Sequence, residues 1–125
     1  AGQYRQRSMR ALPPALQEKY FAADAGGYRP QAELARRVTS WSVVNLMTPE
    51  EVAPYARSPI VFCRNAFIYF SPQSVTRTVE QFAGLMPSPG YLCVGASESL
   101  LNVTNRFALV ELDRSFVFVK LGSDA

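Results

Sequence analysis

Histidine is absent from the 125-residue sequence. Without imidazole the chain lacks the commonest general base and a frequent zinc ligand, which excludes most hydrolase triads and most zinc sites. Cysteine is scarce, with only Cys63 and Cys93, each inside a run of apolar residues. Two such thiols are too few for a metal site, and they are more typical of a packed core than of a disulfide or redox pair. We therefore expect no metal centre.

Long hydrophobic runs and glycine-rich loops are also lacking. No stretch approaches the ~20 apolar residues that a membrane-spanning helix needs, and no basic segment followed by an apolar one opens the chain. We therefore expect a cytoplasmic protein without direct membrane insertion. The pair Gly26-Gly27 is typical of a hairpin turn and does not resemble a loop that binds phosphate or a nucleoside.

Charged residues are few, at 18% of the chain, while hydrophobic residues make up 48%. This composition is typical of a globular protein. The net charge is +3, and Arg5, Arg7 and Arg10 lie close together near the start. Such a cluster can bind nucleic acid, but it is more often a solvated face, and an acidic protein surface fits the same charges. We expect a protein partner and no nucleic acid.

The first part of the chain predicts short helical segments and a hairpin. Pro13 and Pro14 are typical of the first turn of a helix. The segment 20–30 predicts a small β-hairpin, in which Gly26 and Gly27 supply the turn.

The remainder predicts strands that alternate with helices. The side chains of residues 38–44 alternate in type in the manner of a strand. Thr48 followed by Pro49 is typical of the start of a helix. The run 60–63 is apolar throughout, as expected for a strand covered on both faces. Further along we expect a helix that begins at Ser71 and buries positions 75, 79, 82 and 83, a strand at 91–95, and two strands at 107–112 and 116–121.

These elements indicate an α/β sheet that ends in an antiparallel hairpin. Two apolar strands separated by an amphipathic helix predict a parallel β-α-β unit, and the closing pair adds strands of reversed direction. Ligands of such sheets bind at the carboxyl ends of the strands. The residues that follow Cys63 and Gly95 are therefore the first candidates for a site.

Polar residues appear abruptly after the strand at 60–63. Arg64 offers a planar donor fork that suits a carboxylate, and Asn65 offers two donors and an acceptor. Tyr69 lies four residues past Asn65, so one helical turn would place both side chains on the same side. The residues alone leave two interpretations open. One is a ligand site, and the other is a helix capped by Asn65 with Tyr69 half-buried in the core.

The run Val61-Phe62-Cys63-Arg64-Asn65-Ala66-Phe67-Ile68-Tyr69-Phe70 resembles the IFCRNVLIYF signature of CheR-type chemotaxis receptor methyltransferases. Other elements of that family follow in the same order, namely Gly2-Gln3-Tyr4, Ser8-Met9-Arg10, Tyr20-Phe21, Val44-Asn45-Leu46, Pro89-Gly90-Tyr91-Leu92 and Gly95-Ala96-Ser97-Glu98-Ser99-Leu100. The resemblance implies that residues 1–125 form the carboxyl-terminal half of a Rossmann-like class I methyltransferase domain. The hairpin at about 20–30 resembles the β-subdomain, which in some members docks a receptor-tail peptide.

The same resemblance implies a cofactor and a reaction. The family transfers a methyl group from S-adenosylmethionine to glutamate side chains of chemotaxis receptors, giving glutamate methyl esters and S-adenosylhomocysteine. By position, Asn45 and Leu46 resemble residues at the adenosine end of the cofactor. Arg64 and Asn65 resemble residues around its methionine portion and the transfer site. Tyr69 resembles a tyrosine near the methyl group, so Arg64 and Tyr69 are the implied catalytic residues.

Several parts of the family pattern have no counterpart here. The glycine-rich loop, the ribose-binding acid and the receptor-binding helical domain are not found, which implies that amino-terminal strands of the sheet are missing. In the strand order of the family, two of these missing strands lie between the strand at 38–44 and the strand at 60–63. Their absence leaves open sheet edges, which favour self-association. We therefore expect a methyltransferase portion that is inactive by itself. The alternative is a non-enzymatic protein-interaction module with the same half fold. A nucleic-acid methyltransferase fits less well, because its Asp/Asn-Pro-Pro-aromatic loop is replaced by Arg64-Asn65-Ala66-Phe67.

Overall fold

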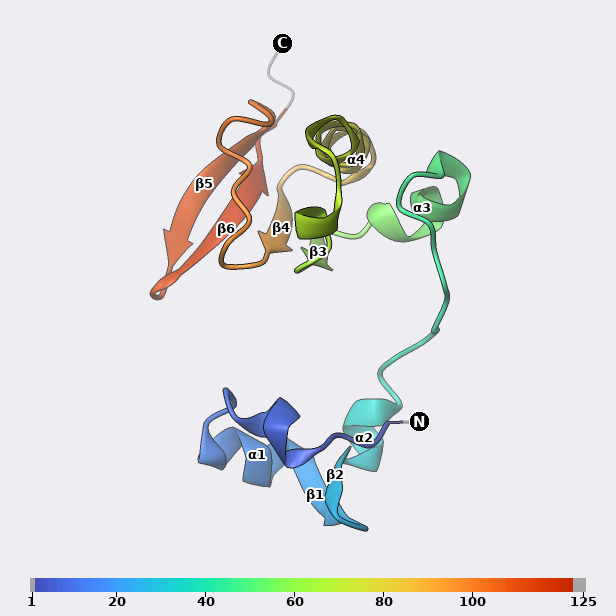
Figure 1. Ribbon diagram of the computed structural model, residues 1–125, viewed down its shortest axis with the longest axis vertical. Helices are drawn as coiled ribbons and strands as arrows, with labels where there is room; N and C mark the ends of the chain where they lie inside the picture. Colours follow the sequence, from blue (N-terminus) through green and yellow to red (C-terminus); the bar gives the residue numbers. More distant parts are fainter. Residues whose placement is uncertain (1, 123–125) are drawn as a thin grey trace. The chain divides into compact units, whose positions relative to one another are not determined.

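The computed structural model describes residues 2–122. The chain consists of two compact units, and the boundary between them in the sequence lies between Val43 and Val44 (Figure 1). The first unit contains η1 (Gln6–Met9), α1 (Pro14–Tyr20), β1 (Phe21–Asp24), β2 (Gly27–Pro30) and α2 (Ala32–Ala35). The second contains α3 (Pro49–Ala56), β3 (Ile60–Cys63), η2 (Phe67–Tyr69), α4 (Pro72–Leu85), β4 (Gly90–Val94), β5 (Phe107–Leu112) and β6 (Ser115–Lys120).

The predicted hairpin of the first unit is confirmed, but its turn differs from the prediction. Strands β1 and β2 pair antiparallel, and Ala25 and Gly26 form the turn, with φ angles of 42° and 84°. Gly27 already belongs to β2, and it is needed for another reason. A Cβ at this position would lie 2.7 Å from the backbone oxygen of Tyr4, which pairs with Tyr28 beside the hairpin. The close approach of two backbones therefore explains this glycine.

The strand predicted at 38–44 is not present. These residues are irregular, and the side chains of Trp41 and Val43 are 83% and 99% exposed. An alternating pattern gives only a preference for extended backbone, and a strand also needs a neighbour with which to form a hydrogen-bonded ladder. No segment between residues 2 and 122 pairs with 38–44.

The main sheet confirms the expected α/β architecture with a closing antiparallel hairpin. Its strands lie in the order β3-β4-β6-β5, with β3 parallel to β4 and the other neighbours antiparallel. Ser71 caps α4, because its hydroxyl oxygen accepts the Ser74 N–H at 3.2 Å. Thr48 occupies the N-cap position of α3 as predicted, but its side chain makes no capping hydrogen bond. The proposed amino-terminal strands of the sheet stay a prediction.

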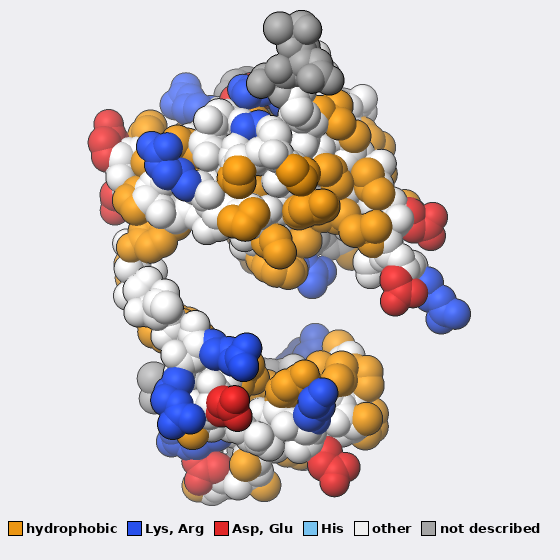
Figure 2. All heavy atoms as spheres, turned by 180° about the vertical axis from the view of Figure 1, so that it is seen from behind, with side chains coloured by type: hydrophobic (Ala, Val, Ile, Leu, Met, Phe, Trp, Pro, Cys, Tyr) orange, Lys and Arg blue, Asp and Glu red, His pale blue; other side chains and the backbone are white. Residues whose placement is uncertain are grey.

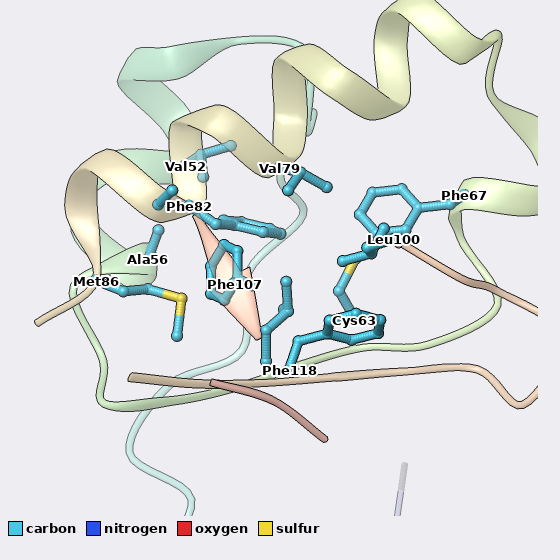
Figure 3. Packing of buried hydrophobic residues seen from close by; sticks show 12 residues of the cluster. Val52, Ala56, Cys63, Phe67, Val79, Phe82, Met86, Leu100, Phe107 and Phe118 are labelled. Carbon is cyan, nitrogen blue, oxygen red and sulfur yellow. The ribbon is translucent and has the colours of Figure 1, made fainter. Parts of the chain in front are cut away.

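The core of the second unit lies between the sheet and its two helices. Val79 and Phe82 on α4 pack in one cluster with Phe118 on β6 (Figure 3). Ala83 on α4 and Leu92 on β4 belong to the same cluster, and each of the five is at most 4% exposed. The alternating pattern of β4 and the helical spacing on α4 produce this arrangement, because each places its apolar residues on one face. The core thus holds in place the strands β3 and β4, after which the candidate site residues follow in the chain. None of the helices in the described part of the chain is long and apolar enough to span a membrane.

Candidate functional site at the carboxyl ends of the strands

Three segments meet along one edge of the main sheet. Strands β3 and β4 are parallel, so both end at this edge, and β6 begins there because it runs antiparallel to β4. The turn between β5 and β6 therefore lies at the same edge as the arrowheads of β3 and β4 (Figure 1). The residues after Cys63 and Gly95 are neighbours there, as the sequence predicted.

A buried carboxylate joins the two loops that follow β3 and β4. Glu98, whose exposed fraction is 9%, accepts the Asn65 N–H and the Gly95 N–H at 2.7 Å each through Oε1. Its other oxygen, Oε2, accepts the Ile68 N–H at 3.2 Å. We call this arrangement the Glu98 clamp. It satisfies three backbone donors that no strand or helix would satisfy at this place.

Glu98 is held in its ionised form. Burial of the carboxyl acts to raise its pKa, but hydrogen bonds from backbone N–H groups, first among them those of Asn65 and Gly95, outweigh burial and lower the pKa below its ordinary value. The negative charge is therefore taken up by backbone donors rather than by a cation. At neutral pH this carboxylate is a structural acceptor and not a proton donor.

Gly95 is required by the closeness of the two loops. A Cβ built on Gly95 would lie 2.4 Å from Oδ1 of Asn65 and 2.7 Å from Oε1 of Glu98. Both distances are far shorter than a van der Waals contact, so only glycine leaves room for the carboxylate to reach the Gly95 N–H. Sequence reasoning placed Gly95 at the end of a strand but gave no reason for the glycine.

Asn65 adopts a backbone conformation that explains its residue type. Its φ angle is 59°, in the left-handed region that asparagine tolerates better than most residues. This conformation turns the chain sharply after β3 and aims the Asn65 N–H at Glu98. The side chain oxygen meanwhile lies against Gly95.

The expected helical turn from Asn65 to Tyr69 is wrong. Only Phe67–Tyr69 are helical, as a 3-10 turn, and the left-handed backbone at Asn65 precedes it. Asn65 provides no side-chain cap to this turn, and Tyr69 is 83% exposed. The alternative of a capping Asn65 with a half-buried Tyr69 is therefore wrong as well.

Arg64 lines a hollow that opens beside the clamp. The hollow measures about 520 Å³ and lies between the ends of β3 and β4 and the start of β6. Arg114 and Ser115 line it from the β5–β6 turn, and Phe62 lines it from β3. We call it the β4–β6 hollow. Arg64 is itself exposed.

A second, smaller hollow lies against β3. It measures about 170 Å³ and is apolar, with Leu46 and Val44 before α3, Tyr55 on α3 and Phe62 on β3 among its lining residues. We call it the β3 hollow. Asn45, which lies between Val44 and Leu46 in the sequence, is exposed. Its Oδ1 accepts the Met47 N–H at 3.0 Å, and this hydrogen bond fixes the turn into α3.

The structure thus brings some of the candidate residues together and leaves others apart. Asn65 contacts the loop at 95–98 through the Glu98 clamp, Arg64 lines the β4–β6 hollow together with that loop, and Leu46 shares the β3 hollow with Phe62. Asn45 and Tyr69 line neither hollow. Glu98 was not identified from the sequence as a site residue. It could have been, because Glu98 is the single acidic residue of the motif Gly95-Ala96-Ser97-Glu98, which follows a buried strand.

Cys63 and Cys93 are free thiols, as their sequence context predicted. Burial, with a smaller contribution from the negative charge of Glu98, raises the pKa of the Cys63 thiol to about 11. The thiol is therefore protonated at neutral pH and packs as part of the core.

Comparison with known proteins gives the family of the chain. Residues 1–116 match the family described as "CheR methyltransferase, SAM binding domain". The chain is 36% identical over 110 residues to the chemotaxis protein methyltransferase of Vibrio anguillarum, and 31% identical over 109 residues to that of Vibrio parahaemolyticus. Each alignment covers 87% of this chain and 39% of the relative, so the chain spans well under half the length of these proteins.

A more distant relative is the chemotaxis protein methyltransferase 1 of Pseudomonas aeruginosa, which is 29% identical over 119 residues, or 94% of this chain and 43% of that protein. The family match covers all of the candidate residues and names the cofactor that the domain binds, S-adenosylmethionine. The chain belongs to the CheR methyltransferase family and matches its S-adenosylmethionine-binding domain over residues 1–116.

Proposed function

We propose that this chain is the carboxyl-terminal portion of an enzyme that methylates glutamate side chains of chemotaxis receptors. The observation that carries the proposal is the Glu98 clamp, which holds the backbone of Asn65 at the carboxyl edge of the sheet, while the preceding residue, Arg64, lines the hollow beside it. A polar, rigidly held loop at this edge is what a ligand site of an α/β sheet requires. Membership of the CheR family and the names of the relatives support the reaction class.

The chemistry suits a chain without histidine. A glutamate side chain has a reference pKa near ~4.3, so at neutral pH it is already the nucleophile and needs no general base. When bound, S-adenosylmethionine supplies an electrophilic methyl group and leaves as S-adenosylhomocysteine. The protein therefore has to orient the acceptor carboxylate and exclude water from it. Guanidinium, amide and phenol groups are suited to this task.

We assign the β3 hollow to one end of the cofactor. Its apolar lining by Leu46, Val44 and Phe62 suits the faces of an adenine ring, and the nearby Asn45 amide can still donate hydrogen bonds through its nitrogen. Asn65, close to the transfer site, is the candidate for the methionine portion. We assign Asn45, Leu46, Arg64 and Asn65 as the cofactor-binding residues within this chain.

Arg64 and Tyr69 are the proposed catalytic residues. Arg64 is exposed and lines the β4–β6 hollow, where a guanidinium group can hold the acceptor carboxylate by two parallel hydrogen bonds. Tyr69 is 83% exposed, so an acceptor side chain can reach its hydroxyl. Exposure of both groups is consistent with a role toward a protein substrate rather than in the core.

By itself, the 125-residue chain should bind the cofactor weakly and transfer no methyl groups. Its relatives are much longer, and the chain aligns with only 39% of the two Vibrio proteins. The β3 hollow and the Asn45 amide account for only a part of the groups on S-adenosylmethionine. Each charge-assisted contact that is lacking weakens binding by tenfold or more, because ~1.4 kcal/mol corresponds to a factor of ten.

A chimera tests the proposed function. Residues 1–116 of this chain replace the matching segment of the Vibrio anguillarum relative, and transfer of labelled methyl groups to a glutamate-containing receptor peptide is measured. We expect activity, and we expect Arg64→Ala to lower kcat/KM by about 10-fold to 100-fold, the value of one oriented charged contact.

Arg77→Ala, on the exposed face of α4, is the matched control and should leave both activity and melting temperature unchanged. A folded chimera that binds S-adenosylmethionine but methylates no glutamate would contradict the proposed substrate. Equal loss of stability and activity in Arg64→Ala would instead assign a structural role to Arg64.

One observation favours the second candidate function, a protein-interaction module. The free edge of β3 exposes Ile60 and Phe62 by 56% and 72%, and hydrophobic side chains gather on one face of the unit 44–122 (Figure 2). Such an edge pairs readily with another strand, including that of a second copy. Light scattering of the chain with and without cofactor separates the two functions, because a pure interaction module associates without any effect of S-adenosylmethionine.

A further inference from the structure

The β4–β6 hollow has a second arginine that the proposed function does not use. Arg114 lies in the turn between β5 and β6, and it lines the hollow opposite Arg64. Ser99, Ser115, Phe62 and Phe116 also line the hollow, and the Ser99 hydroxyl oxygen accepts the Leu101 N–H at 3.4 Å. Two guanidinium groups, two hydroxyls and apolar walls together form a surface suited to an anionic group on an organic carrier.

The hollow exists because β4 and β6 separate near the edge of the sheet. Their pairing ends at Leu92 and Phe118, so the last residues of β4 have no partner on β6. Arg114 sits in a tight two-residue turn in which Asp113 and Arg114 have φ angles of 45° and 67°. A turn of this kind has a fixed backbone direction, which holds Arg114 at the rim of the hollow.

The charge balance of the hollow favours an anion. Glu98 lines it too, but its carboxylate is already engaged by the N–H groups of Asn65, Gly95 and Ile68. Within residues 2–122, neither Arg64 nor Arg114 has a carboxylate within 4.0 Å. Both guanidinium groups are thus available to an incoming ligand.

We infer that Arg114 and Arg64 form a docking site for an acidic peptide, in which a second carboxylate next to the methyl-accepting glutamate is held by Arg114. This inference rests on the proposed function, because a glutamate acceptor makes an acidic peptide the ligand. A peptide fits the hollow better than a nucleic acid does, since the walls are aromatic and two cations are few for a run of phosphates. Arg114 is then a specificity-determining residue and not a catalytic one.

Fluorescence anisotropy on the 125-residue chain tests the inference. The probe is a fluorescein-labelled short peptide that carries adjacent glutamates among alanines, and the comparison probe replaces these glutamates by glutamines. We expect the glutamate peptide to bind more tightly, with an affinity that falls as salt rises. Arg114→Gln should weaken its binding about threefold to tenfold, as expected for one charged contact at the rim of a site.

Two further variants keep the test independent of folding. Arg114→Gly suits the left-handed backbone, so it should melt at or above the temperature of the unmodified chain while losing the same affinity. Arg77→Gln on α4 removes one exposed positive charge elsewhere and should leave affinity unchanged. Equal binding of both peptides, or equal affinity of the Arg114 variants and the unmodified chain, would overturn the inference. Tighter, Arg114-dependent binding of an oligothymidine probe would overturn the assignment to a peptide.

The outcome separates this inference from the proposed function. Anisotropy requires neither S-adenosylmethionine nor methyl transfer, so Arg114-dependent binding with no methylation by the chimera would reject the proposed function alone. In an active chimera, Arg114→Gln should raise KM for the glutamate peptide with kcat unchanged, because a docking contact acts equally in the ground state and the transition state. A fall in kcat at constant KM would reject the docking role alone.

Discussion

Oε1 of Glu98 lies 2.7 Å from the backbone nitrogen of Asn65, although the two residues are 33 positions apart in the sequence. The same oxygen accepts the Gly95 N–H, so one atom bridges the loops that follow two neighbouring strands. The polar residues after β3 are therefore held by a carboxylate from the loop after β4. The candidate site depends on this contact for its shape.

Replacement of Glu98 by glutamine should destabilise the second unit. The amide keeps one oxygen as acceptor, but its NH₂ group then faces the Ile68 N–H, which it cannot accept. We expect the free energy of unfolding in denaturant to fall by about 1.5–3 kcal/mol, the value of hydrogen bonds to a charged group. Glu111→Gln on the exposed part of β5 is the matched control and should change it by less than about 0.5 kcal/mol. Similar losses in both variants would contradict the role of the clamp.

Stability should depend on pH through the same carboxyl group. The pKa of Glu98 is lower in the folded chain than the ~4.3 of an unfolded one, so protonation favours unfolding. Its contribution is complete at neutral pH, declines as the pH falls below the unfolded pKa, and is lost below the folded pKa. Unfolding curves at several pH values should show the difference between the unmodified chain and Glu98→Gln shrinking in acid. A difference that stays constant down to pH 2 would be evidence against an ionised Glu98.

Gly95→Ala should disrupt the meeting of the two loops. The added methyl group would lie 2.4 Å from Oδ1 of Asn65, and overpacking of this kind costs about 1–3 kcal/mol. Gly84→Ala is a sharp control, because a Cβ at this position of α4 meets nothing within 4 Å and alanine favours a helix over glycine by about 0.5–1 kcal/mol. Thermal melts should therefore shift in opposite directions for the two substitutions. A neutral Gly95→Ala would mean that the loops separate easily.

Two substitutions of Asn65 separate its backbone from its side chain. Asn65→Gly preserves the left-handed φ of 59° and the N–H that binds Glu98, so stability should change by less than about 1 kcal/mol. Asn65→Val puts a β-branched residue in the left-handed region and should cost more than Asn65→Gly, by about 1–3 kcal/mol. If the amide also contacts the cofactor, titration calorimetry of the chimera should show weaker S-adenosylmethionine binding for the glycine variant. Retained affinity in that variant would remove Asn65 from the proposed cofactor site.

Local signals were sufficient for much of the fold. The helical spacing of Val79, Phe82 and Ala83 on α4 and the proline after Ser71 depend on neighbours within a few residues, so the sequence displays them directly. The apolar run of β3 predicted the strand correctly, but its expected coverage on both faces is wrong, because Ile60 and Phe62 are 56% and 72% exposed. The segment 38–44 shows the limit of such signals, since alternation indicates extended backbone but not whether a partner strand is present. The same limit applies to the turn at Ala25 and Gly26, where two turn registers fit the same residues.

The candidate site was predictable in its location but not in its construction. Polar residues after apolar strands indicated the correct edge of the sheet, and Arg64 and Asn65 lie there as expected. The roles of Gly95 and Glu98 depend on distances between loops that are far apart in the chain, and no local pattern reports such distances. The left-handed backbone of Asn65 accompanies the Glu98 clamp and is incompatible with the helical turn that the spacing of Asn65 and Tyr69 suggested.

The crowding around Gly95 has a consequence for how this sequence can change over time. Positions 65, 95 and 98 share one small volume, so a larger side chain at 95 displaces the ends of the Asn65 and Glu98 side chains unless those positions change as well. Single substitutions at these places are then harmful in isolation and acceptable in combination, which is epistasis between sites about thirty residues apart. Positions 65, 95 and 98 should therefore covary among homologues of this protein.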